Sequence, residues 1–209
     1  DLRPKAVAGV PPDYFSDTGQ LWGNPVYDWR RLARDGFKWW LGRIGRTLEL
    51  FDMVRIDHFR GLVAYWEVAA GARTAKNGKW VDARPGEFFD AVMRAFPKMP
   101  LIAEDLGVIT PDVVDWIERL GLASMKVLQF AFDDPGVNTH IPHNHIRNCI
   151  VYTGTHDNNT TRGWYWRELS RGRKKNLRAY TGGSVTKTNV HEVLMRMAMG
   201  SVADCCILP

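Results

Sequence analysis

Three acidic residues, Asp57, Glu104 and Asp157, each follow a short apolar run that has the length of a buried strand. The runs that precede them span residues 53–56, 101–103 and 149–152. Such runs are typical of parallel strands, which are buried on both faces. One aspartate at a strand end would be read as a surface ion pair, but the repetition of the pattern indicates a site. Because the carboxyl ends of parallel strands lie at one edge of a sheet, we expect the three carboxylates to converge.

Carboxylates arranged in this way can exchange a glycosidic bond with retention of configuration. That reaction needs a carboxylate nucleophile and a protonated carboxylic acid about 5 Å apart. A third carboxylate can orient sugar hydroxyls and balance the positive charge that develops at the anomeric carbon. Each carboxylate has a basic or hydrogen-bonding neighbour in the sequence: Arg55 or His58 for Asp57, Asp105 for Glu104, and His156 for Asp157.

The neighbours of two carboxylates predict different protonation states. Arg55 lies two residues before Asp57, on the same face of the strand, and is expected to hold the pKa of Asp57 low. Glu104 would have to stay protonated in the free enzyme. Its pKa is therefore expected to be raised by nearby carboxylates and by burial.

The elements that would position these residues alternate between strand and helix. Strands are predicted over residues 53–56, 101–103, 125–130, 149–152 and 202–208, and helices over 28–34, 37–50, 87–96, 110–121, 161–167 and 189–199. This alternation predicts a parallel sheet with outer helices, and polar residues at successive strand ends favour a barrel. A doubly wound sheet would show a Gly-rich phosphate loop, which is missing. Five strands predict a partial (β/α)8 TIM barrel, roughly strands 4 to 8, whose N-terminal part is missing.

Two stretches of the sequence read as connections. Residues 7–27 show no period and carry several turn formers, so they predict a long loop, and aromatic residues such as Tyr14, Phe15 and Trp22 argue that this loop is ordered. Residues 71–86 read as a polar loop. Within it, Asn77-Gly78 predicts a tight hairpin turn.

Composition excludes several classes of function. The net charge of +5 comes from dispersed Lys and Arg, apart from a run at 171–175 that reads as a solvated helix start, so nucleic-acid binding is not expected. No apolar stretch approaches the roughly 18 residues of a membrane span. The three cysteines form no disulfide framework or metal spacing. His140, His143 and His145 could ligate zinc, but no acidic or cysteine partner lies nearby, and a sugar contact or plain loop is favoured. No metal or cofactor is expected.

Five motifs in order resemble the 4-α-glucanotransferases, the amylomaltase or disproportionating enzymes of glycoside hydrolase family 77, which are related to the α-amylases. They are PPDYFSDTGQLWGNPVY, VRIDHFRG, AEDLGVITP, MKVLQFAFDD and YTGTHDNNT. The resemblance runs from Gly9 to Asp157 and more weakly to Ala203. It implies a (β/α)8 barrel with Asp57 as nucleophile, Glu104 as general acid/base and Asp157 as stabiliser of the transition state.

The same resemblance implies further contacts with substrate. The stretch 7–27 matches the family's acceptor-side aromatic loop, with Trp22 as a stacking platform. The substrate-binding residues that it implies are Asp13, Gln20, Trp22, Arg55, His58, Asp134 and His156. Members of the family are considerably longer than this chain, so residues 1–209 are expected to be the C-terminal portion of one catalytic barrel domain. We expect this segment to be unstable and inactive without the N-terminal part that closes the barrel.

The resemblance implies transfer of an α-1,4-glucan segment to another glucan through a covalent glycosyl-enzyme. The expected partners are maltooligosaccharides, starch or glycogen, and the expected location is the cytoplasm of a bacterium or the plastid of a plant. Two alternatives stay open. One is a glucan hydrolase of the α-amylase type, which uses the same carboxylates with water as acceptor, and the other is a non-catalytic glucan-binding relative.

Overall fold

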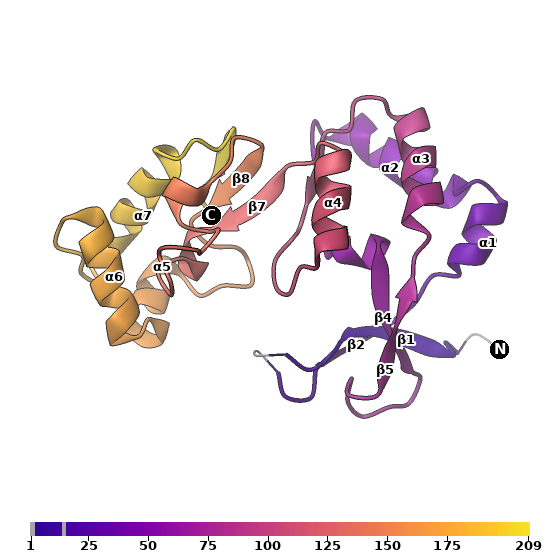
Figure 1. Cartoon of the computed structure of the whole chain (residues 1–209), viewed down its shortest axis with the longest axis horizontal. Coiled ribbons are helices and arrows are strands. Elements are labelled where there is room, and N and C mark those ends of the chain that lie inside the picture. The colour runs from indigo at the N-terminus through magenta and orange to yellow at the C-terminus, as the bar shows by residue number, and fades with distance from the viewer. Residues whose placement is uncertain (1–2, 14–15) are drawn as a thin grey trace. The chain divides into compact units, whose positions relative to one another are not determined.

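A computed structural model describes residues 3–13 and 16–209 (Figure 1). Tyr14 and Phe15, which contributed to the predicted aromatic loop, lie outside the described residues. The chain divides into two compact units, Asp1–Leu122 and Ala123–Pro209. Each unit is described by itself.

The first unit contains a two-stranded parallel sheet of β3 (Val54–Ile56) and β6 (Leu101–Ala103). Val54 pairs with Leu101 and Ile56 with Ala103, so the two strands end level with each other. Both predicted strands are confirmed. β6 is fully buried, but β3 is only half-buried, which corrects the expectation of a fully buried strand.

Four helices pack around this pair: α1 (Trp29–Arg34), α2 (Lys38–Leu50), α3 (Pro85–Ala95) and α4 (Pro111–Arg119). The Asp28 side chain accepts a hydrogen bond from the Arg31 backbone N–H, so the predicted cap of α1 is confirmed. Thr110 holds the predicted cap position of α4, although its side chain makes no capping hydrogen bond. The apolar faces of the helices share one core, whose largest members include Trp29, Phe37, Phe59, Phe88 and Phe89.

A second sheet in this unit is antiparallel, with the order β2-β1-β4-β5 (Figure 1). Its strands are β1 (Ala6–Val10), β2 (Gln20–Pro25), β4 (Ala64–Ala69) and β5 (Gly78–Asp82). The prediction of a loop throughout residues 7–27 is therefore wrong, because β1 and β2 both lie in that stretch. Pairing of β1 with the distant β4 determines these strands, and β2 is exposed along its whole length, so it has no alternating apolar pattern.

The connection between β4 and β5 also differs from the prediction. The two strands do form a hairpin, but Gly78 already pairs with Val68 inside the ladder, so the turn is longer than residues 76–79. Residues 78–82, read as loop, are strand. A Cβ at position 78 would collide with the Trp66 ring, which explains glycine there without a turn.

The second unit is built on a parallel sheet with the order β7-β8-β9. Its strands are β7 (Ser124–Val127), β8 (Cys149–Tyr152) and β9 (Cys205–Ile207), and its helices are α5 (Thr161–Gly163), a π-helix (Trp164–Glu168), α6 (Arg171–Thr181) and α7 (Val190–Met199). All three predicted strands are present. The one predicted over 125–130 ends at Val127, because Leu128–Phe130 turns into a 3-10 helix.

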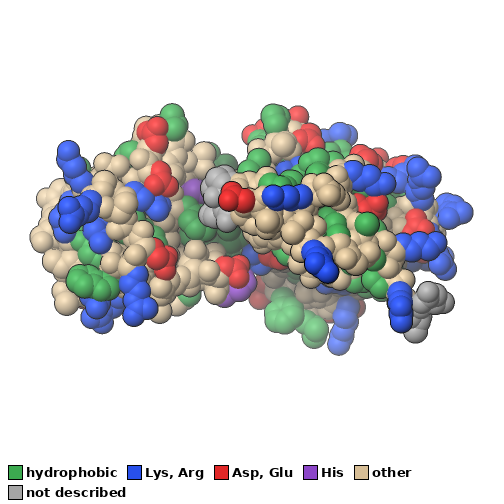
Figure 2. All heavy atoms as spheres, turned by 90° about the horizontal axis from the view of Figure 1, so that it is seen from below, with side chains coloured by type: hydrophobic (Ala, Val, Ile, Leu, Met, Phe, Trp, Pro, Cys, Tyr) green, Lys and Arg blue, Asp and Glu red, His purple; other side chains and the backbone are tan. Residues whose placement is uncertain are grey.

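The chain thus has a mixed α/β fold in which all five predicted parallel strands form. The face shown in Figure 2 carries Lys and Arg side chains that are interspersed with acidic and hydrophobic ones. None of the helices in the described residues is long and apolar enough to cross a membrane.

Candidate active site

The carboxyl ends of β3 and β6 place Asp57 and Glu104 side by side along the sheet edge. Each residue directly follows one of the paired residues Ile56 and Ala103. The backbone ladder continues past the strands: the Glu104 N–H donates to the Ile56 carbonyl at 3.0 Å, and the Phe59 N–H donates to the Glu104 carbonyl at 3.1 Å. Both acidic residues are therefore attached to a rigid sheet edge.

The Glu104 carboxylate is held by two backbone donors. Oε2 accepts from the His58 N–H at 2.7 Å, and Oε1 accepts from the Leu106 N–H at 2.9 Å. Burial raises the pKa of Glu104 above its ordinary value, and each of the two backbone N–H groups lowers it by a smaller amount. Of the nearby charges, Asp57 raises this pKa and Arg55 lowers it. The predicted direction is confirmed, with burial as the main cause. Glu104 is thus suited to hold a proton.

Asp57 is an accessible carboxylate with a fixed cationic partner. The Arg55 Nη2 donates to Asp57 Oδ1 at 2.7 Å, so the two side chains lie on one face as predicted. Asp57 exposes 76% of its side chain, whereas Arg55 exposes 28%. An accessible carboxylate beside a buried carboxyl group whose pKa is raised is the pair that nucleophilic attack on an anomeric carbon requires.

His58 connects this carboxylate pair to the antiparallel sheet. Its backbone is left-handed, with φ 47° and ψ 56°, which aims its N–H at Glu104. Its ring meets Trp22 of β2 edge to face, with centroids 4.7 Å apart. The pKa of His58 is lowered to about 4, mainly by burial and secondly by the charge of Arg60, while the charge of Asp57 acts in the opposite direction. The ring is therefore neutral at neutral pH.

A cavity of about 410 Å³ opens beside these residues and has Trp22, Trp40, Tyr65, Asp57 and His58 among its walls. Trp22 is 43% exposed, so part of its ring is available to a ligand. Aromatic rings beside carboxylates suit sugars, which present apolar CH faces together with hydroxyls.

The other residues of the predicted acceptor loop differ in their placement. The Gln20 Oε1 accepts from the Trp22 Nε1 at 3.3 Å, so Gln20 supports the indole that contacts His58. Asp13 lies in the turn before β2, where its Oδ1 accepts from the Ser16 N–H at 2.9 Å. Asp13 is not among the residues that line the cavity at Asp57.

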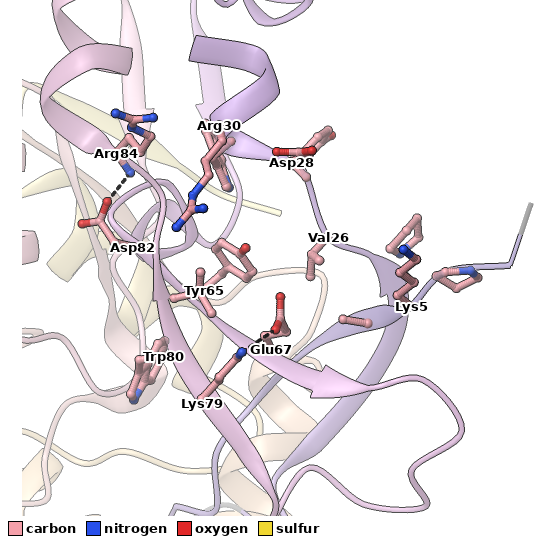
Figure 3. Close-up of a pocket in the computed structure, with 16 residues that line it drawn as sticks. Lys5, Val26, Asp28, Arg30, Tyr65, Glu67, Lys79, Trp80, Asp82 and Arg84 are labelled. Atoms are coloured by element: carbon pink, nitrogen blue, oxygen red, sulfur yellow. Dashed lines mark hydrogen bonds and ion pairs between the residues drawn. The ribbon is translucent and has the colours of Figure 1, made fainter. Parts of the chain in front are cut away.

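A larger cavity, of about 940 Å³, shares Tyr27 and Tyr65 with the cavity at Asp57. Figure 3 shows Tyr65 among the residues that line the larger cavity. Its walls carry an ion pair of Lys79 Nζ with Glu67 Oε1 at 3.2 Å. Trp80 also lines it and is 41% exposed. No pattern in the sequence indicates this cavity, because its walls come from β1, β4, β5 and the segment before α1.

In the second unit, Asp157 and His156 lie in the turn after β8. His156 Nε2 is 3.4 Å from Asp157 Oδ2, and the Asp157 N–H donates to Thr155 Oγ1 at 3.3 Å. Thr155 is itself held by Asn158, whose Oδ1 accepts its N–H at 2.8 Å. Both the His156 and the Asp157 side chains are largely exposed, at 74% and 79%. The turn therefore presents both groups to solvent.

Asp134, predicted to contact a donor sugar, lies in a turn in which its Oδ1 accepts from the Gly136 N–H at 3.2 Å. The three histidines nearby use different partners: His140 Nδ1 accepts from the Val127 N–H, His143 contacts the Tyr180 hydroxyl, and His145 lies 2.7 Å from Ser201 Oγ. No group of three His, Cys, Asp or Glu side chains among the described residues could hold a metal ion.

The structure thus brings together one group of predicted residues, Asp57, Glu104, Arg55, His58, Gln20 and Trp22, in the first unit. Asp157, His156 and Asp134 lie in the second unit, so the convergence of all three carboxylates stays a prediction. The backbone donors to Glu104 were not predicted, because every residue except proline carries an N–H and the sequence does not mark those that point at a carboxylate.

Paired carboxylates at neighbouring strand ends, beside an aromatic cavity, are typical of proteins that act on glycosidic bonds. The chain belongs to glycoside hydrolase family 77, 4-alpha-glucanotransferase, whose sequence model matches residues 2–209. The 4-alpha-glucanotransferase of Thermus thermophilus is 49% identical over 212 residues, which cover 99% of this chain and 42% of that protein. The chloroplastic/amyloplastic 4-alpha-glucanotransferase of Solanum tuberosum is 47% identical, covering 99% of this chain and 35% of its own length.

Solved structures agree with this family. The amylomaltase from Streptococcus agalactiae, solved in complex with acarbose, superposes with a TM-score of 0.92 at 37% identity and covers 98% of this chain and 41% of its own. The amylomaltase from Corynebacterium glutamicum has a TM-score of 0.75 at 18% identity, a likeness of fold alone. The chain spans about two fifths of the length of its Thermus and Streptococcus relatives.

Proposed function

We propose that this chain carries the catalytic groups of a retaining 4-α-glucanotransferase, which transfers an α-1,4-glucan segment to the 4-hydroxyl of another glucan or of glucose. The observation that carries the proposal is the pair of Glu104, with its raised pKa and two backbone donors, and Asp57, exposed and paired with Arg55. The names of the relatives and the acarbose complex of the Streptococcus enzyme support glucans as substrates.

The reaction proceeds by two displacements. In the first, an Asp57 oxygen attacks the anomeric carbon of the donor while Glu104 gives its proton to the leaving oxygen, so the C–O bond breaks and a glycosyl ester forms on Asp57. In the second, ionised Glu104 takes the proton of the acceptor 4-hydroxyl, which attacks the same carbon and releases Asp57. Glu104 is protonated again at the end, and the number of glycosidic bonds is unchanged.

The remaining predicted residues take supporting roles in this proposal. Asp157, with His156 and Asp134, would orient donor hydroxyls and stabilise positive charge at the anomeric carbon. The aromatic stretch 7–27, with Asp13, Gln20 and Trp22, would bind the acceptor. Transfer exceeds hydrolysis only if water is excluded while the acceptor binds. The contact of Trp22 with His58 and its position in the wall of the cavity support such a role for Trp22.

We further propose that the parallel strands are roughly strands 4 to 8 of a (β/α)8 barrel. One edge of β3 has no strand neighbour in the described part of the chain, and Leu50, Phe51 and Met53, which precede it, are 59%, 61% and 47% exposed. An unpaired strand edge and exposed apolar side chains before the strand suit a protein partner, here the N-terminal part of the same enzyme. Bacterial and plastid relatives point to the bacterial cytoplasm or a plastid as the location.

Product analysis on maltotriose tests the proposal, using the full-length product of the gene that encodes this chain. Transfer yields glucose together with chains longer than maltotriose, whereas an α-amylase-type hydrolase yields only shorter ones. Trapping a covalent glycosyl ester on Asp57 with an activated fluoro-sugar donor would exclude a non-catalytic binding protein. A folded wild-type protein that gives only shorter products, or none, would overturn the proposal.

A further inference from the structure

Arg60 makes two contacts that tie separate segments of the first unit together. Its guanidinium Nη1 donates to the Val108 carbonyl at 2.8 Å. Its Cζ lies 4.0 Å from the centroid of the Trp80 ring, which places the cation over the face of the indole. Asp112, in the first turn of α4, adds a favourable charge nearby.

The segments that Arg60 joins are the two that supply the hydrogen bonds to Glu104. His58, the first donor, lies two residues before Arg60, and Arg60 belongs to the short 3-10 helix Phe59–Leu62. Leu106, the second donor, lies two residues before Val108. Arg60 therefore links the two segments that hold the Glu104 carboxylate, and it also contacts Trp80 of β5.

We propose that Arg60 is a positioning residue for Glu104, which holds the two segments at the separation that keeps both backbone N–H groups on its carboxylate. The inference rests on the proposed function, in which Glu104 is the acid/base. The geometry requires arginine rather than lysine, because a planar guanidinium can lie flat on an indole while it donates in its own plane, whereas an ammonium is a point charge. The sequence pattern did not indicate this role.

Loss of this tie has a distinct chemical consequence. The two N–H groups stabilise the ionised form of Glu104, so loosening either one raises its pKa further. The charged groups that face Glu104, Asp57 and Arg55, are left unchanged by a substitution at position 60. A displacement of the acid of about 1 Å can reduce turnover about 100-fold, while binding of maltotriose depends on other groups.

The test compares Arg60→Lys with Arg119→Lys in the full-length gene product. Arg119 also lies over an indole, with its Cζ 4.9 Å from the Trp116 centroid, but it is exposed and touches neither donor segment, so it is a matched control. Because lysine keeps the positive charge, any effect at position 60 reports geometry. We expect Arg60→Lys to lower kcat about 10- to 100-fold with little change in KM, and to move the alkaline limb of the pH profile to higher pH. Arg119→Lys is expected to match the wild type.

A second readout does not depend on activity. A carbon-13 NMR titration of glutamate carboxyls, with the Glu104 signal assigned by its loss in Glu104→Gln, should give a higher pKa for Glu104 in Arg60→Lys than in the wild type. An unchanged pKa of Glu104 in the folded variant would overturn the inference. So would a fall in kcat that is explained by the loss of folded protein, if the alkaline limb of the pH profile stays where it is in the wild type. If the wild type shows no transfer, the proposed function fails, but the titration still decides whether Arg60 positions Glu104.

Discussion

Replacing Glu104 by Gln is expected to lower transfer about 10²- to 10⁴-fold, the range for loss of one general acid/base. The substitution keeps the size and planar shape of the side chain but removes its transferable proton. In the structure the carboxylate has one oxygen for each of two donors, His58 N–H at 2.7 Å and Leu106 N–H at 2.9 Å. Glutamine has only one oxygen, so its NH₂ group must face the other N–H.

The structure also sets the effect on stability. A lost hydrogen bond to a charged group costs about 1.5–3 kcal/mol. Against this, the amide is neutral, so it avoids the free-energy cost of burying a charged group. That cost is the main reason why the pKa of Glu104 lies above the ordinary value of 4.5. A raised pKa means that the folded wild type binds the proton more tightly than the unfolded chain, so this group's stability is fully present below about pH 4.5 and is lost as the pH rises through the folded pKa. Glu104→Gln should therefore be most destabilised, relative to the wild type, at low pH.

The assay combines glucose release from maltotriose at saturating substrate with urea unfolding at about pH 4 and pH 7. The control is Glu118→Gln, at an exposed position of α4. Near wild-type transfer by Glu104→Gln would refute the assignment of the acid/base. A stability difference that grows with rising pH would refute the cause given for the raised pKa.

Three other results are expected. Gly154→Ala places a Cβ 2.6 Å from Gln129 Nε2, which is buried and donates to the Asn159 carbonyl. The substitution should therefore lower the free energy of unfolding in urea by about 1–3 kcal/mol and reduce transfer by moving the turn before Asp157. The control Gly172→Ala, whose Cβ would have its nearest atom at 3.9 Å, should not lower the free energy of unfolding. Burial lowers the pKa of His140 from 6.5 to about 4, so the free energy of unfolding of the wild type should decrease as the pH drops through that interval. The free energy of unfolding of His140→Asn should decrease less over the same interval, and an equal decrease would contradict this explanation. Residues 1–209 expressed alone should show neither transfer nor a cooperative thermal transition, and calorimetry that finds a sharp transition would disprove this.

Much of the parallel framework could be predicted from the sequence because its signals are local. The strands β6 and β8 are continuous apolar runs, and Asp28 begins α1 with a side-chain cap. The antiparallel sheet could not be predicted in the same way. Its strand β2 is exposed throughout, and β1 is defined by its pairing with β4, more than fifty residues away in the chain.

For the candidate site, the sequence determined which residues could react. A carboxylate directly after an apolar strand is a local feature, and its repetition along the chain is what singles out Asp57 and Glu104. How these residues are held is visible only in the folded protein: the left-handed backbone of His58, the two N–H bonds to Glu104 and the Arg60 contact with Trp80. The physical reason is that the sequence records side-chain chemistry, whereas the direction of a backbone donor and the burial that shifts a pKa arise only when distant segments pack together.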